Sequence, residues 1–372
     1  MSKPLRVGII SANWGAHAHL PAWRSLEGVE VTAICTSRPE TAQAAAETYG
    51  IARAFHSYQQ MAADPDIDII DCGTRPPLRE QMVEAALSHG KHVYNGIPFA
   101  TSLAAARKML ASQQAAGKVG AVDAFMQAVP ALVRLREMID EGVLGEIHGF
   151  RVTIEMPLFT AARVNVPDYL WFAEAANGAS AMRNNGAHAL HLLVWLFGPV
   201  EAIVANQSLR LAHWATEHRT VETQVPDTAF AILRFADGLT GQLASVWSMV
   251  AGPGFRIDVW GRDGRLVAHA PIFPQSFDTE LFLSKPGQLG ERTERRVDIP
   301  ARLKSLPGST ADADALLPGV FPMASIFSSM RAAIAGDGRA APDFVQAVHV
   351  QEIIEAANIS SKEERWIAVS DL

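Results

Sequence analysis

The first third of the chain alternates short apolar runs with alanine-rich segments, and this alternation constrains the fold more than any other feature. The apolar runs cover residues 6–10, 29–34 and 67–72, and they are typical of buried parallel strands. The segments between them carry apolar side chains at helical spacing, as Ala42 and Ala46 do. Because strands that alternate with helices form parallel sheets, the pattern predicts an open, doubly wound α/β domain.

The bulk composition excludes several classes of partner. A length of 372 residues predicts two domains. A net charge of -7 without a basic block is unsuited to nucleic acid, and no apolar run is long enough to cross a bilayer. Cys35 and Cys72 lie in predicted buried strands, which favours reduced core thiols and a cytoplasmic protein. We therefore expect a small-molecule substrate rather than nucleic acid or a membrane.

Ligands of doubly wound sheets bind where the strands end, so the residues after each strand are the candidate cofactor site. Small side chains after the first strand allow a close backbone approach to a pyrophosphate. The glycine pattern usual for such a turn is incomplete, and a plain strand-to-helix turn is the alternative. A further short apolar run is expected to follow Gly90 as a fourth strand and to end in the turn Gly96-Ile97-Pro98. The candidates after the first, third and fourth predicted strands are Ser11, Ala12, Asn13, Trp14, Gly15, Ala16, Gly73, Thr74, Arg75, Pro76, Gly96, Ile97 and Pro98.

The second predicted strand is followed by Ser37 and Arg38, with no carboxylate to accept the ribose hydroxyls of NAD. A hydroxyl beside a guanidinium suits a 2′-phosphate, because guanidinium binds phosphate through charge-assisted hydrogen bonds. This favours NADP(H), with NAD(H) as the other choice. The alternative is a solvated arginine near a helix start.

Several segments in sequence order resemble the glucose-fructose oxidoreductase, inositol dehydrogenase and rhizopine-catabolism (Gfo/Idh/MocA) family. They are residues 7–21, Ser37-Arg38, Gly90-Lys91-His92-Val93, Pro98, Gly145-Glu146-Ile147, 177–181, 185–188, 196–200, 225–228, 261–264 and 343–358. The resemblance implies an N-terminal Rossmann domain over residues 1–123. It also implies a C-terminal α+β domain over residues 124–372, with a large open, mostly antiparallel sheet. The outer face of that sheet often makes oligomers in this family, so we expect a homodimer or homotetramer.

The resemblance also implies hydride transfer between nicotinamide and a secondary alcohol or carbonyl of a sugar, cyclitol, dihydrodiol or aromatic-type substrate. Family members carry a lysine in a Glu-Lys-Pro turn and an aspartate four residues before a histidine; here these positions hold Ile97 and Asn184. His188 keeps the histidine, and we expect it to be the acid–base, oriented by Asn184. Tyr94 is a candidate substitute for the lysine, with packing inside its strand as the alternative.

Candidate substrate contacts follow from the same resemblance. They are Tyr94, Gln127, Trp171, Phe172, Arg183, His188 and His191, and the neighbouring rings of Phe159 and Tyr169 could also grip a flat substrate. Core packing is the alternative for each aromatic ring. No metal is expected, because nothing near His188 and His191 completes a ligand set. Two other functions stay open: redox-neutral elimination or hydrolysis around a resident dinucleotide, and a non-catalytic dinucleotide-binding sensor or co-regulator.

Overall fold

The structure is a computed structural model that describes residues 3–291 and 293–372. These residues form two compact units: Met1–Ala128 with Lys304–Val348, and Val129–Leu303 with His349–Leu372. The break at 128/129 lies close to the expected boundary at 123/124, but residues 304–348, which were expected in the C-terminal domain, belong to the first unit. Ser309, for example, bridges to Leu26.

The first unit is built on a six-stranded parallel sheet with strand order β3-β2-β1-β4-β5-β6. This order confirms the predicted doubly wound sheet, and the order reverses between β1 and β4. The strands are β1 (Leu5–Ile10), β2 (Val29–Cys35), β3 (Arg53–Phe55), β4 (Ile69–Cys72), β5 (His92–Asn95) and β6 (Gly120–Val122).

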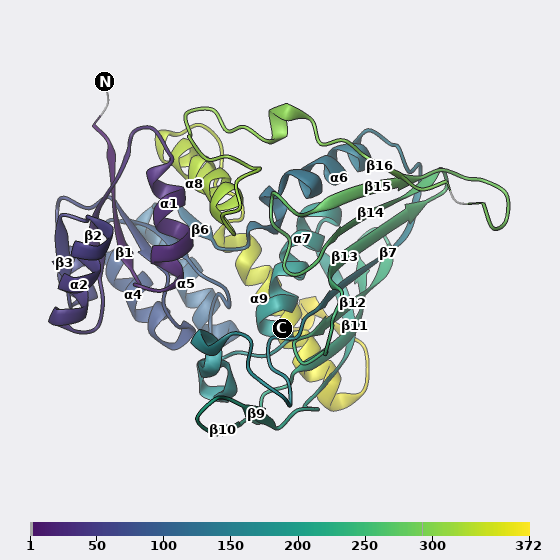
Figure 1. The fold of residues 1–372 in the computed structure, drawn as a ribbon, viewed down its shortest axis with the longest axis horizontal. Coiled ribbons are helices and arrows are strands. Elements are labelled where there is room, and N and C mark those ends of the chain that lie inside the picture. The colour runs from purple at the N-terminus through teal and green to yellow at the C-terminus, as the bar shows by residue number, and fades with distance from the viewer. Residues whose placement is uncertain (1–2, 292) are drawn as a thin grey trace. The chain divides into compact units, whose positions relative to one another are not determined.

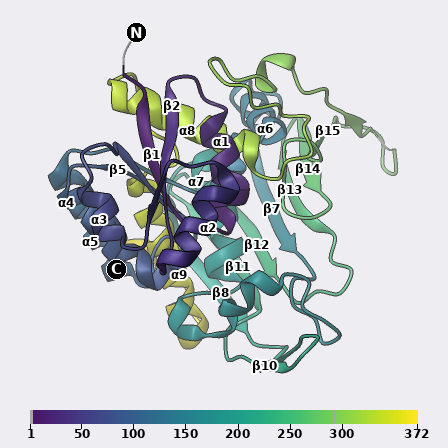
Figure 2. The same ribbon diagram turned by 60° about the vertical axis from the view of Figure 1, so that its left-hand side comes forward.

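Helices cover both faces of this sheet (Figures 1 and 2). Helices α3, α4 and α5 share one face, where Met61, Val83 and Met109 join one hydrophobic core. On the other face α1 packs against α8, and Trp23 stacks on Phe327 with ring centroids 3.6 Å apart. The helices are η1 (Gly15–His19), α1 (Leu20–Arg24), α2 (Pro39–Tyr49), α3 (Tyr58–Ala63), α4 (Pro76–Ser88), α5 (Leu103–Ala116), η2 (Phe125–Ala128) and α8 (Val320–Ala335).

The second unit is built on a nine-stranded sheet with order β16-β15-β14-β13-β7-β12-β11-β8-β17. Only the β7–β12 pair is parallel, which agrees with the expected mostly antiparallel sheet. Its strands are β7 (Ile147–Glu155), β8 (Val200–Ser208), β11 (Thr228–Phe235), β12 (Thr240–Val246), β13 (Gly254–Gly261), β14 (Gly264–Ala270), β15 (Glu280–Ser284), β16 (Arg295–Arg296) and β17 (Ile367–Ala368). A separate hairpin pairs β9 (His213–Ala215) with β10 (Thr220–Glu222).

Helices α6 (Pro130–Asp140) and α7 (Ala187–Phe197) lie on the same side of this sheet in Figure 1, and α9 (Phe344–Glu363) runs into the second unit. Short helical turns complete the unit: η3 (Pro167–Ala173), η4 (Ala175–Asn177), η5 (Met182–Gly186), η6 (Ala301–Leu303) and η7 (Val369–Asp371). Along β11 buried side chains alternate with exposed ones, as expected for a sheet with one covered face. Across the described residues, no helix is both long and apolar enough to span a membrane.

Candidate functional site

The turns that follow β1 and β4 approach each other closely. A Cβ atom added to Gly73 would lie 3.2 Å from the Cβ of Ser11, and one added to Gly15 would lie 3.0 Å from the same Ser11 atom. A side chain at either position would therefore crowd Ser11, and glycine allows the two turns to approach this closely. The approach lies where the strand order reverses, which is where doubly wound sheets bind dinucleotides.

The other predicted residues of the first turn differ in their exposure. Ala12 and Asn13 are exposed, Trp14 is half-buried and Ala16 is buried. The carbonyl oxygen of Asn13 accepts hydrogen bonds from the backbone N–H groups of Ala16 and His17, both at 2.9 Å. The π-helical turn η1 begins directly after Trp14, and such turns are frequent at functional sites.

At the end of β2, Ser37 and Arg38 are both exposed. Arg38 is the N-cap residue of α2, and its side chain, 65% exposed, lies 3.4 Å from Glu40. An ion pair in water is weak, so this contact leaves the guanidinium accessible to a phosphate group.

The turns after β4 and β5 contain the remaining predicted cofactor residues. Thr74 and Ile97 are half-buried and Arg75 is exposed, whereas Pro76, Gly96 and Pro98 are buried. Because β4 and β5 are parallel neighbours, both turns leave the sheet at the same edge. The structure thus brings all predicted cofactor residues of the first unit to one edge of the sheet.

A buried polar network lies beneath this edge, and sequence reasoning missed it. His19 Nδ1 lies 2.9 Å from Asp71 Oδ1, and His19 Nε2 lies 3.4 Å from Asp123 Oδ2. Trp23 Nε1 donates to Asp71 at 2.8 Å, and Trp14 Nε1 donates to Asp123 at 3.2 Å. The network therefore ties the turn after β1 to the end of β6. One sequence signal could have found it, a carboxylate at position 71 inside an otherwise apolar strand.

The imidazole of this network is charged at neutral pH. Burial alone would lower the pKa of His19, but the carboxylates of Asp71 and Asp123 outweigh burial and raise this pKa to about 10. His19 and Asp71 are both fully buried. One imidazolium thus lies between two carboxylates, an arrangement that compensates the cost of burying charge.

Tyr94 belongs to the same network. Its hydroxyl donates to Asp123 Oδ1 at 3.0 Å, and the side chain is fully buried. Burial, together with the neighbouring carboxylates, raises the pKa of Tyr94 well above its usual value. The observed surroundings match the alternative of a packed strand tyrosine. Proton donation to a substrate stays a prediction that requires this hydroxyl to leave Asp123.

In the second unit, Asn184 lies in the π-helical turn η5 and His188 in the first turn of α7. The side-chain oxygen of Asn184 accepts from the backbone N–H of Ser180 at 3.1 Å. His188 is half-buried, and its ring meets Phe273 edge-on with centroids 4.8 Å apart. The Asn184 oxygen is thus committed to the backbone, so its predicted orienting role depends on the amide nitrogen.

The other polar candidates are more enclosed. His191 is 1% exposed, and burial, with repulsion from His188 and His349, lowers its pKa to about 3. Arg183 Nε donates to the carbonyl of Gly178 at 2.8 Å, and burial lowers the pKa of this guanidinium. Direct substrate contacts by His191 and Arg183 stay predictions.

Gln127 is a first-unit residue, since it lies in η2 and is 7% exposed. The side chain of Gln346 donates to its oxygen at 3.1 Å. This bond ties η2 to the start of α9 within the same unit. The contact between Gln127 and a substrate stays a prediction.

The aromatic segment forms a core of its own. Phe159 is fully buried and stacks on Trp214, with centroids 3.8 Å apart, and Phe172 is 6% exposed beside Trp247. For Phe159 and Phe172 the surroundings match the alternative of core packing. Trp171 lies at the edge of this cluster and is half-buried, which makes it the better candidate for a substrate contact.

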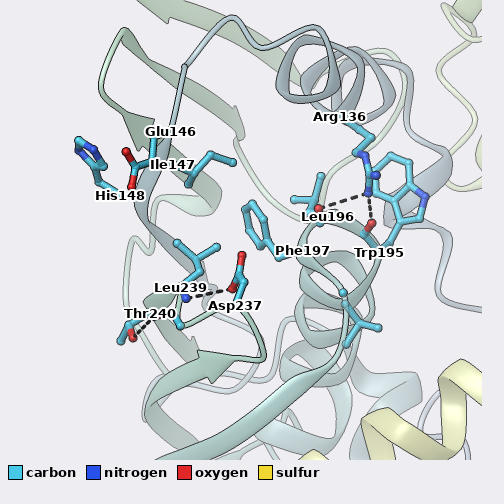
Figure 3. Close-up of a pocket in the computed structure, with 13 residues that line it drawn as sticks. Arg136, Glu146, Ile147, His148, Trp195, Leu196, Phe197, Asp237, Leu239 and Thr240 are labelled. Atoms are coloured by element: carbon cyan, nitrogen blue, oxygen red, sulfur yellow. Dashed lines mark hydrogen bonds between the residues drawn. The ribbon is translucent and has the colours of Figure 1, made fainter.

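Figure 3 shows a hollow of the second unit. Its volume is about 1120 Å³, and its lining includes residues 194–197 at the C-terminal end of α7, whereas His188 lies at the N-terminal end of this helix. Arg136 lies beside it and donates to the carbonyl oxygen of Leu196 at 3.2 Å and to that of Trp195. None of the residues predicted for cofactor or substrate lines this hollow. Within residues 3–291 and 293–372, no group of three histidine, cysteine or acidic side chains could hold a metal ion.

The chain is similar to curated proteins and to solved structures. An uncharacterized oxidoreductase of Synechocystis sp. is 23% identical over 380 residues, which cover 100% of this chain and 98% of that protein. D-apiose dehydrogenase of Paraburkholderia graminis is 26% identical over 282 residues, covering 72% of this chain and 73% of that enzyme. The structure of levoglucosan dehydrogenase with NADH and L-sorbose superposes with a TM-score of 0.84 at 21% identity, and 99% of each chain is covered.

Two family models match consecutive parts of the chain. Residues 5–124 match a model described as an oxidoreductase family with an NAD-binding Rossmann fold. Residues 132–267 match the GFO/IDH/MocA C-terminal domain. The two matches follow the two sheets described above and cover most of both. The chain therefore belongs to the GFO/IDH/MocA family of oxidoreductases.

Proposed function

We propose that this chain is an NAD(P)-dependent oxidoreductase acting on a secondary alcohol or carbonyl group of a sugar-like substrate. The close approach of the turns after β1 and β4 carries the proposal, because Gly15 and Gly73 let these turns pack together where the strand order reverses, the place where doubly wound sheets bind dinucleotides. The printed names of two similar proteins, D-apiose dehydrogenase and levoglucosan dehydrogenase, support a sugar-like substrate.

The bound nicotinamide would supply the hydride chemistry, and side chains of the chain would handle the proton. His188 exchanges a proton with the substrate oxygen, since a neutral imidazole is an effective base near pH 7. Ile97 stands where the family resemblance places a lysine. An isoleucine side chain neither exchanges a proton nor stabilises an alkoxide. Proton transfer to or from the substrate oxygen therefore depends more strongly on His188.

Binding and turnover assays test this function. Titration with NADH and NADPH is expected to give saturable binding. With a reduced cofactor, carbonyl substrates should then be reduced, and with an oxidised cofactor the alcohols of sugars or cyclitols should be oxidised, both followed at the absorbance band of the reduced nicotinamide. Turnover without net change at that band, with a cofactor that does not exchange, would favour redox-neutral chemistry. Binding without any turnover would favour a sensor, and absence of binding to either dinucleotide would contradict the proposal.

The cofactor preference forms a separate prediction. We propose that NADP(H) binds more tightly than NAD(H), because the exposed guanidinium of Arg38 is available to a 2′-phosphate. Arg38→Ala is expected to weaken NADPH binding by about tenfold or more, in line with the loss of one charge-assisted contact, and to leave NADH binding unchanged. Equal weakening of both cofactors, measured by fluorescence titration, would remove the phosphate contact from the proposal.

We also propose that the outer face of the nine-stranded sheet joins copies of this chain into a dimer or tetramer. That face carries large exposed apolar side chains on neighbouring parts of the sheet: Phe230 (50% exposed), Ile232 (38%) and Trp260 (39%). Large exposed apolar groups favour association. Phe230→Asp is expected to yield monomers in light scattering coupled to size exclusion. Leu78→Asp is the matched control, since Leu78 is 49% exposed on the first unit, and it should leave the assembly intact. A monomeric wild type would refute this interface.

A further inference from the structure

Arg79 is a buried cation that joins the two turns at the ends of β4 and β5. Its side chain is 2% exposed. Nε donates to the carbonyl oxygen of Thr74 at 2.6 Å, and the terminal nitrogens donate to the carbonyls of Pro98 at 2.7 Å and Ile97 at 3.3 Å. A single guanidinium thus holds both turns in place, with three bonds to main-chain oxygens.

The backbone is adapted to this side chain. A Cβ atom added to Gly96 would lie 2.9 Å from a terminal nitrogen of Arg79. Any larger residue at position 96 would therefore displace the guanidinium or the turn. Burial lowers the pKa of Arg79 to about 10, so the group carries a full positive charge at neutral pH.

The positive charge of Arg79 lies in the half of the sheet that we expect to bind the nicotinamide nucleotide. Each half of such a sheet takes one nucleotide, and the pyrophosphate crosses at the reversal of strand order. The half that contains β1, β2 and β3 includes the Ser37-Arg38 turn proposed for the adenosine end. The half that contains β4, β5 and β6 is then left for the nicotinamide, and Arg79 lies under the turns of this half.

We propose that Arg79 is a positioning residue whose fixed charge, held beneath the turns after β4 and β5, makes the protein bind the reduced cofactor more tightly than the oxidised one. This inference rests on the proposed function. The oxidised nicotinamide ring carries a positive charge and the reduced ring carries none, so a fixed cation nearby disfavours only the oxidised form. Arg79 thus affects the cofactor in two ways: its charge repels the oxidised ring, and its hydrogen bonds fix the two turns. It transfers no proton.

The test compares dissociation constants of the oxidised and reduced cofactor at pH 7.5. In the wild type the oxidised form is expected to bind about tenfold more weakly than the reduced form. Arg79→Gln should reduce this ratio by about fivefold to tenfold, whereas Arg79→Lys, which keeps the charge, should preserve it.

Lys91 provides a matched control. It is 7% exposed, and its ammonium group donates to the carbonyl oxygens of Asp64 at 2.6 Å and Ile67 at 2.7 Å. It too is a buried cation bonded to main-chain oxygens, but it lies at the amino end of β5, away from the proposed cofactor turns. Lys91→Gln is therefore expected to lower thermal stability without changing the ratio of the dissociation constants of the oxidised and reduced cofactor.

Several results would overturn the inference. A wild-type protein that binds both forms equally would refute it without any variant. If Arg79→Gln weakens both forms by the same factor, the residue has a structural role alone. If Arg79→Gln does not fold, the Arg79→Lys protein provides the test. Because lysine keeps the positive charge, equal dissociation constants for the oxidised and reduced cofactor in folded Arg79→Lys would contradict the inference. Failure of the wild type to bind either form would instead refute the proposed function.

Discussion

Replacing His188 with alanine is expected to lower turnover by about 10² to 10⁴-fold, the usual contribution of a positioned general acid–base. His188 is half-buried at the start of α7, so its ring is partly accessible to a ligand. The dissociation constant for NADPH should stay the same, because the residue is proposed to act on the substrate oxygen. The measurement is steady-state kinetics on the best substrate of the panel, with cofactor binding measured in parallel.

Two further variants make this test specific. His148→Ala is the control, since His148 is an exposed histidine of the same unit and its loss should leave turnover unchanged. Asn184→Asp keeps an oxygen that can accept from Ser180 and adds a negative charge four residues before His188. A nearby carboxylate favours imidazolium, so the acid limb of the pH–rate profile should move upward by about one pH unit. Unchanged turnover in His188→Ala would exclude the histidine from the chemistry.

The free energy of unfolding is expected to fall steadily as the pH rises from about 6.5 to about 10. In the folded protein His19 has a pKa of about 10, whereas an unfolded histidine has a pKa of about 6.5. The folded state therefore holds a proton that the unfolded state has released over this range. The stabilisation is complete below the unfolded pKa and disappears through the folded one, with a slope of roughly 1.4 kcal/mol per pH unit.

Denaturant unfolding at a series of pH values checks this prediction. His19→Gln is expected to abolish the slope, because glutamine can still hydrogen-bond to Asp71 or Asp123 but binds no proton. His17→Gln is the control, since His17 is exposed in the same π-helical turn and should leave the slope intact. Wild-type stability that stays constant between pH 7 and 9 would show that the imidazolium is not buried between the two carboxylates.

The sequence predicted the sheet of the first unit and the edge where its turns gather. Strand and helix periodicities are local signals, and the carboxyl ends of parallel strands meet at one edge whatever the details of packing. The turn residues from Ser11 to Pro98 could therefore be named in advance. Family resemblance supplied the second domain and its mostly antiparallel sheet, which local patterns outline only as separate hairpins.

The sequence did not predict which polar groups would be buried together. Asp71 and Asp123 lie 52 and 104 residues from His19 in sequence, and only the strand order brings the three side chains into contact. The three carbonyl partners of Arg79 were equally unpredictable, because they depend on the shapes of two turns. Likewise the buried position of Phe159 follows from its stacking partner Trp214, which lies in a distant segment.

The discontinuity of the first unit affects how this protein can be made in the cell. Helix α8 supplies Phe327, which stacks on Trp23, yet it emerges from the ribosome only after most of the second unit. Until α8 has been synthesised, Trp23 of the nascent N-terminal segment lacks this stacking partner. Exposed apolar surface in such intermediates promotes aggregation. We therefore expect the N-terminal segment to be most prone to aggregation during synthesis, before α8 is available to cover Trp23.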